Sequence, residues 1–163
     1  MNFVDELLDI LGTLSAVEVI ETVTVMWADT THGITEEQSM HYPVFMQDLL
    51  HIIDFDTVCN RDGLENFVKY NDTQGYAATI KAFERCGYVE GAEILATIRL
   101  QKDVCKRQQN GHGKLSKETL TLIESLENKF YYERVDTEFW QLVEQYVENE
   151  KHKPLYPSER TLS

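Results

Sequence analysis

The stretch Ser15–Trp27, SAVEVIETVTVMW, decides between a helical and a strand-rich fold. Its Val, Ile and Thr content favours strands, because β-branched side chains fit a pleated surface. Its spacing favours a helix, because apolar side chains recur every three or four residues on one face. Ser15 and Glu18 also form the S-x-x-E capping box that marks a helix N-terminus. We therefore predict a helix that begins after Ser15 and ends near Gly33. The residues of its apolar face are Ala16, Ile20, Val23 and Trp27.

The rest of the chain repeats this helical spacing. Further helices are predicted over residues 5–11, 44–58, 62–71, 76–86, 92–109, 116–130 and 139–146. No segment shows the period-two alternation typical of strands. We predict an all-α fold, with a single compact domain of about six to eight helices over residues 1–153 and a frayed tail at residues 154–163.

Residues at the predicted helix ends support these boundaries. The segments 35–38 and 62–65 each have the spacing of a capping box, with Thr35 and Asp62 as the first residues. Pro43 is placed at a helix start, and Gly87 at a helix C-terminus.

The net charge is −13, from 28 acidic and 15 basic residues. Residues 1–80 hold 14 acids and two bases, while residues 81–163 hold 14 acids and 13 bases. The two halves therefore carry −12 and −1. Such a chain repels phosphate backbones and anionic membranes, so we expect no direct contact with nucleic acid or membrane. The excess charge fits either a solubilising surface or a negative face directed at a basic partner.

Carboxylates on a helix can imitate a row of phosphates. Acids three or four residues apart project from one helix face, and an i, i+4 pair stands about 6 Å apart along the axis. This distance is comparable to the spacing of backbone phosphates. The candidate partner-binding acids all lie in the first half of the chain. They are Glu18, Glu21, Asp29, Glu36, Glu37, Asp48, Asp54 and Asp56.

Catalytic and metal-binding motifs are absent from the sequence. There is no HExxH, phosphate-binding loop or nucleophile elbow, so we predict no catalytic residue, no cofactor and no metal. Three cysteines without CxxC spacing indicate reduced thiols, and the N-terminal residues lack the basic region of a signal peptide. These features predict a cytoplasmic protein.

A pattern of glycines and aromatic residues covers most of residues 45–148. Leu50–Phe67 resembles a helix leading into an N-G-G-F-type turn, and Tyr70–Tyr76 resembles an aromatic-N-x-x-G-x-Y step. Thr79–Leu95 resembles a T-x-x-A-L-x-x-x-G-A-x-x-A-A-x-x-L run, and Leu126–Tyr131 resembles a D-x-x-F/Y segment. With these motifs the chain resembles the acidic DNA-mimic protein family and its uncharacterised bacterial relatives.

The resemblance implies an all-helical homodimer that binds a helix-turn-helix repressor and keeps it off DNA. Two positions depart from the family: Asp62 precedes Gly63 where members have paired glycines, and Leu64 stands where they have Phe. The motif positions are expected to form turns, caps and core. They are Gly63, Phe67, Asn71, Gly75 and Gly87.

We therefore predict a non-enzymatic acidic module that binds a basic protein, such as a helix-turn-helix DNA-binding regulator, and acts as a DNA mimic in transcription regulation. One alternative is an immunity or antitoxin-like inhibitor that blocks a basic toxin by the same charge complementarity. Another alternative is an enzyme, which would need a concave pocket with converging titratable groups.

Overall fold

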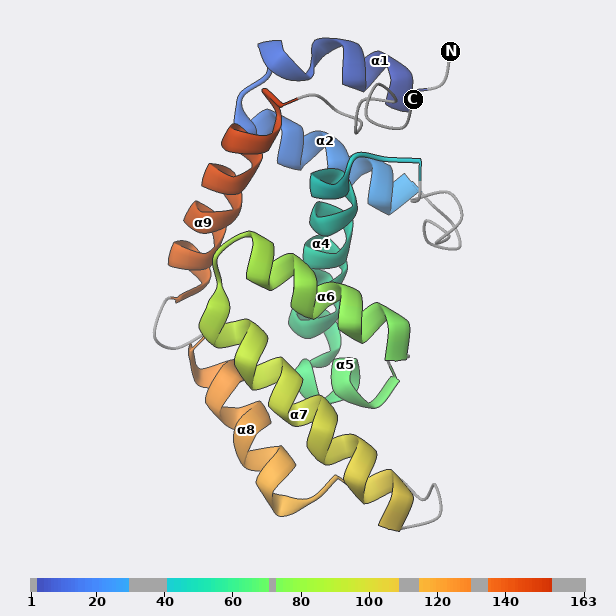
Figure 1. Ribbon diagram of the computed structural model, residues 1–163, viewed down its shortest axis with the longest axis vertical. Coiled ribbons are helices and arrows are strands. Elements are labelled where there is room, and N and C mark those ends of the chain that lie inside the picture. The colour runs from blue at the N-terminus through green and yellow to red at the C-terminus, as the bar shows by residue number, and fades with distance from the viewer. Residues whose placement is uncertain (1–2, 30–40, 71–72, 109–114, 130–134, 154–163) are drawn as a thin grey trace, which may run out of the picture.

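The computed structural model describes residues 3–29, 41–70, 73–108, 115–129 and 135–153 (Figure 1). Within these ranges the chain forms eight α-helices and one 3-10 helix, and none of the described residues lies in a strand. The predicted all-α fold is confirmed. The tail at 154–163, the helix end near Gly33 and the capping box at 35–38 lie outside the described residues. The elements are α1 (Phe3–Ile10), η1 (Leu11–Thr13), α2 (Ala16–Asp29), α4 (Val44–Asp62), α5 (Leu64–Tyr70), α6 (Thr73–Arg85), α7 (Val89–Gln108), α8 (Lys117–Glu127) and α9 (Val135–Glu150).

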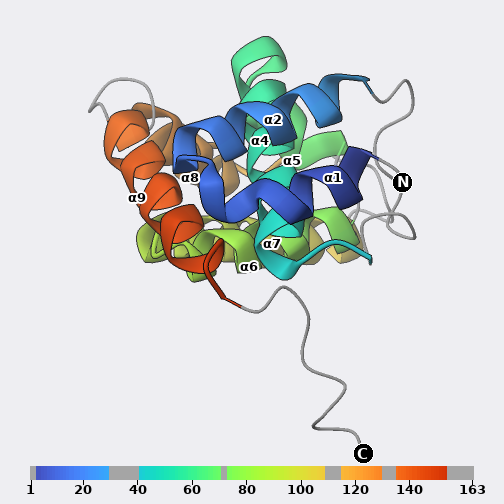
Figure 2. The same cartoon turned by 90° about the horizontal axis from the view of Figure 1, so that it is seen from above.

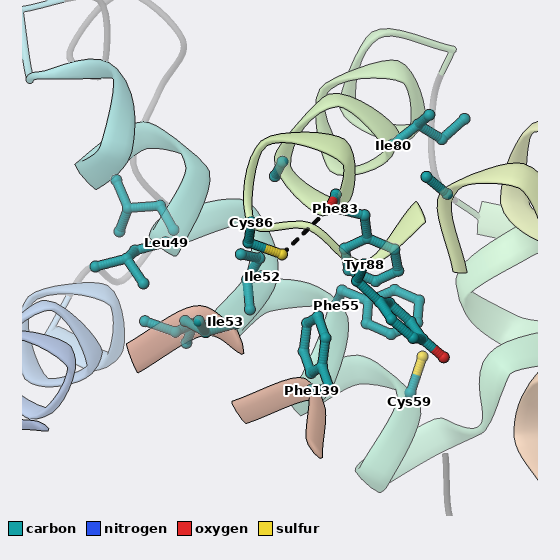
Figure 3. Close-up of a cluster of buried hydrophobic side chains, with 14 of the residues drawn as sticks. Leu49, Ile52, Ile53, Phe55, Cys59, Ile80, Phe83, Cys86, Tyr88 and Phe139 are labelled. Carbon is teal, nitrogen blue, oxygen red and sulfur yellow. Dashed lines mark hydrogen bonds between the residues drawn. The ribbon is translucent and has the colours of Figure 1, made fainter. Parts of the chain in front are cut away.

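Helix α4 is the central element, and aromatic rings hold its neighbours around it. The Phe55 ring on α4 meets Phe67 of α5 edge-on at 4.9 Å between centroids, and Phe83 of α6 at 5.0 Å. Phe83 in turn contacts Phe139 of α9 at 5.2 Å. Figure 3 shows Phe55, Tyr88 and Phe139 gathered around Phe83. The buried side chains form one continuous cluster, so the described helices pack as one domain.

The N-terminal helices cover one end of the molecule. In Figure 1, α1 and α2 lie at the end where α4 begins and α9 finishes, while α8 and the far end of α7 lie at the opposite end. Figure 2 looks down on the first end, where α1 and α2 lie in front of α4. The buried Lys151, directly after α9, donates hydrogen bonds to the Leu14 carbonyl and to Glu148. This lysine ties the C-terminal end of α9 to the start of α2.

The turn from α6 to α7 requires glycine. Gly87 has a φ of 88°, and its N–H donates to the Glu84 carbonyl at 3.1 Å. The next N–H, of Tyr88, donates to the Phe83 carbonyl at 2.9 Å. These two bonds form a Schellman motif, so the predicted C-terminal role of Gly87 is confirmed.

The corner between α4 and α5 differs from the predicted capping box. Helix α4 runs beyond its predicted end and finishes at Asp62, so Asp62 has a helical conformation unsuited to an N-cap, and its carboxylate pairs with Arg61. Gly63 makes the corner with a φ of 85°. The Leu64 N–H donates to the Glu127 carboxylate of α8 at 3.0 Å. The predicted box is therefore wrong, because a carboxylate far along the chain caps α5.

The other motif positions have different surroundings. Phe67 is buried in the core, with 1% of its surface exposed. Gly75 lies within α6, and Asn71 lies outside the described residues. Each helix in the described part is too short or too polar to cross a lipid bilayer.

Candidate interaction surface

The predicted contact acids are divided between surface and interior. Glu18 and Glu21 are exposed on α2 and lie three residues apart on one helix face. Asp29 is the last residue of α2, and its side chain falls outside the described structure. Glu36 and Glu37 also lie outside the described residues. The exposed acids of the predicted set that the structure places are thus those of α2.

Glu18 fixes the start of α2 as well as adding charge. Its carboxylate accepts the Ser15 N–H at 2.8 Å, and the Ser15 hydroxyl accepts the Glu18 N–H at 3.2 Å. The predicted capping box is therefore confirmed. The hydrogen bond from the Ser15 backbone is the main reason that the pKa of Glu18 lies below its usual value. This hydrogen bond therefore favours the ionised form of the carboxylate.

Three exposed acids at this end have no basic neighbour in the part of the chain that the structure describes. Among the described residues, no basic side chain lies within 4.0 Å of Glu6, Asp9 or Glu21. Residues 1–60 contain no Lys or Arg at all. The exposed pair Glu6 and Asp9, on α1, was not among the predicted acids. The three-residue spacing of Glu6 and Asp9, the same as that of Glu18 and Glu21, could have indicated this pair from the sequence.

Asp48 is not a surface acid, so this part of the prediction is wrong. Only 2% of it is exposed, because it lies on α4 where α6 and α9 cover that helix. Arg85 of α6 donates to one carboxylate oxygen at 2.7 Å, and the Tyr146 hydroxyl of α9 donates to the other at 2.6 Å. Burial raises the pKa of Asp48, and these two partners oppose the rise. The carboxylate joins three helices instead of meeting a partner.

Asp54 and Asp56 are only half-buried, so they are less accessible than the acids of α2. Burial raises the pKa of Asp54, while a hydrogen bond from the Trp27 side chain acts in the opposite direction. The charge of Asp56 contributes to raising the pKa of Cys59, whose own burial is the larger cause. Asp54 is therefore tied to α2, and Asp56 lies close to the core.

The described residues hold little that suits catalysis. No three of their His, Cys, Asp and Glu side chains form a group able to hold a metal ion. Cys59 and Cys86 are buried free thiols. Burial raises the pKa of Cys86 to about 11 and that of Cys59 further. Both thiols are therefore protonated at neutral pH and poor nucleophiles.

The fold and the exposed carboxylates together define an acidic, all-helical protein. The family model described as DMP19-like protein matches residues 41–150, which is more than half of the chain. The chain therefore belongs to the DMP19-like family, named for DNA mimic protein 19, and the predicted family is confirmed. No curated protein and no solved structure matches the chain.

The most acidic segment of the chain lies outside the residues that match the family. Residues 1–40, which include α1, η1 and α2, hold eight acids and no Lys or Arg, for a net charge of −8. Residues 41–150 hold 19 acids and 12 bases, for a net charge of −7 over a much longer stretch. More than half of the net charge of −13 thus precedes the segment shared with the family.

Proposed function

We propose that this chain binds a basic DNA-binding protein through the exposed acids of α1 and α2, and so competes with DNA for that protein. The observation that carries the proposal is the complete absence of Lys and Arg from residues 1–60, which hold 11 acids. Membership of a family named for a DNA mimic supports it. The binding itself needs no catalytic group.

Electrostatics explains why such a surface would attract a DNA-binding protein. Acids three apart on a helix stand about 4.5 Å apart along its axis, and each such pair costs the helix a few tenths of a kcal/mol. A basic partner relieves this repulsion. Because Glu6, Asp9 and Glu21 have no basic neighbour within 4.0 Å in the described structure, their charges are available to that partner.

A displacement assay tests the proposal. The helix-turn-helix regulators encoded in the same genome are purified, and each is bound to its own labelled operator duplex. Adding this protein is expected to release the DNA from one of them, and the affinity of the direct complex between this protein and that regulator is expected to fall steeply between low and high salt. The electrostatic mechanism is tested on the direct complex of this protein with that regulator, and an affinity of that complex that does not weaken with salt would contradict the mechanism. Release of DNA from none of the regulators would contradict the proposal itself.

A basic toxin is the alternative partner, because its positive charges would pair with the same carboxylates. A pull-down from the native host, followed by mass spectrometry, separates the two. Recovery of a toxin in place of a regulator would favour an immunity or antitoxin-like role. A cytoplasmic location is part of the proposal, since a regulator and its DNA lie there.

A homodimer is also part of the proposal, and it is tested separately. Sedimentation equilibrium of the purified chain is expected to give twice the monomer mass of 18.9 kDa. A single species at the monomer mass would contradict it, without bearing on the binding of a regulator.

A further inference from the structure

One row of α2 is exposed and mixes apolar with acidic side chains. Val17, Glu21 and Val25 are spaced four residues apart, so they follow one another along the same side of the helix. Val17 is 46% exposed and Val25 is 55% exposed. By contrast, Val19 and Val23 of the same helix are completely buried. We call Val17, Glu21 and Val25 the outer row of α2.

Neither helix formation nor the core of this chain accounts for the two exposed valines. A β-branched side chain loses rotamer freedom in a helix, and about half of each of these two valines remains exposed to water. The outer row also lies before residue 41, outside the segment that matches the family. The family match therefore does not by itself account for this row.

We propose that the outer row of α2 is the docking site for a protein segment that carries Lys or Arg beside apolar side chains. The proposal rests on the proposed function and adds that recognition is partly apolar. Charge complementarity selects this occupant over others. A purely apolar segment would leave the Glu21 carboxylate unpaired, and a purely basic one would leave Val17 and Val25 in water.

Two synthetic peptides test the chemistry of the occupant directly. Both are helical and have the same length and charge, with Arg on one face. One carries two Leu between the Arg side chains, and the other carries Gln at these positions. Fluorescence anisotropy is expected to show about tenfold tighter binding of the Leu peptide, because burying apolar side chains adds to the charge attraction. Equal affinities, or no binding of either peptide, would overturn the proposal.

Variants then locate the site on the molecule. The double variant Val17→Ala/Val25→Ala keeps α2 folded, because Ala is the better helix former. It is expected to lose about tenfold in affinity for the Leu peptide and little for the Gln peptide. The matched control is Val44→Ala/Val89→Ala, at valines that are 52% and 54% exposed on α4 and α7. An equal loss in both double variants would overturn the location.

The contribution of the Glu21 charge is tested by a separate pair of variants. Glu21→Gln is expected to weaken both peptides at low salt by a few-fold, while Glu93→Gln on the exposed side of α7 is expected to change neither. Equal behaviour of these two variants would also overturn the location.

Failure of the docking site and failure of the proposed function give different results. If the protein displaces DNA from a regulator and Val17→Ala/Val25→Ala displaces it equally well, the function stands and the outer row is not the site. If the protein separates the two peptides but displaces DNA from no regulator, the outer row stands and DNA mimicry fails.

Discussion

At the scale of single residues, a methyl group added at Gly91 would collide with a buried aromatic ring. A Cβ at this position would lie 2.0 Å from Cε1 of the Tyr88 ring. Tyr88 is only 5% exposed and packs against Phe83 and Phe139, so its ring has little room to move. Gly91→Ala is expected to lower the free energy of unfolding by about 3 kcal/mol, measured by urea denaturation.

Gly12 supplies the control for Gly91. A Cβ on Gly12 meets no atom within 4 Å, so Gly12→Ala is expected to stay within about 0.5 kcal/mol of the native chain. Equal stability of the two variants would mean that Tyr88 yields to the added methyl group.

Asp48 is expected to give the chain an unusual dependence of stability on pH. Because burial raises its pKa in the folded state, the folded chain binds the proton more readily than the unfolded chain. The stability from this group is therefore fully present below its ordinary pKa of 3.8 and is lost as the pH rises through the raised value. Thermal unfolding of the native chain and of Asp48→Asn between pH 3 and pH 7 measures this contribution.

The comparison with Asp48→Asn isolates the contribution of this one carboxyl. The native chain is expected to gain stability relative to the variant as the pH falls. Glu18 and Glu148 act in the opposite direction, since hydrogen bonds lower their pKa values, but both groups are present in the two proteins. A difference in stability that does not change with pH would contradict the expected shift.

At the scale of the helices, the capping box of Ser15 holds the start of α2 in place. Ser15→Ala removes the hydroxyl that accepts the Glu18 N–H and is expected to cost about 1 kcal/mol of stability. Faster amide exchange in the first turn of α2 would show where that stability is lost. Thr24→Ala is the control in the same helix, because the Thr24 hydroxyl donates only to the Ile20 carbonyl one turn earlier. An equal loss in both variants would contradict a specific capping role.

The helices whose ends depend on nearby residues could be predicted from the sequence. The Ser15–Glu18 box and Gly87 act within a few residues of the ends that they define. The capping of α5 could not be predicted, because its carboxylate, Glu127, lies 63 residues from the Leu64 N–H that it accepts. Asp48 was misplaced for the same reason: its partners, Arg85 and Tyr146, lie 37 and 98 residues away.

At the scale of the whole molecule, the position of the acids is expected to matter more than their number. The triple variant Glu6→Gln/Asp9→Asn/Glu21→Gln changes the net charge from −13 to −10. The triple variant Glu93→Gln/Glu118→Gln/Glu124→Gln makes the same change on α7 and α8, where these three acids are also exposed. The first variant is expected to need at least about tenfold more protein to displace DNA from the regulator.

The second variant is expected to act like the native chain. Equal losses in the two triple variants would show that net charge alone drives binding and that α1 and α2 have no special part.

The imbalance of charge between the halves could be predicted from the sequence. The sequence could not predict which acids face solvent, because exposure depends on contacts between helices that are distant along the chain. Asp48 is the example.

The bond between Lys151 and Leu14 spans 137 positions of the chain. Helix α2 packs against α4 and α9, both of which are synthesised after it. The bond between Lys151 and Leu14 can therefore form only after α9 has been made. A chain that has not yet reached Lys151 lacks this bond, so a partner that recognises the arrangement of the acids on α2 is expected to bind more tightly once Lys151 is in place.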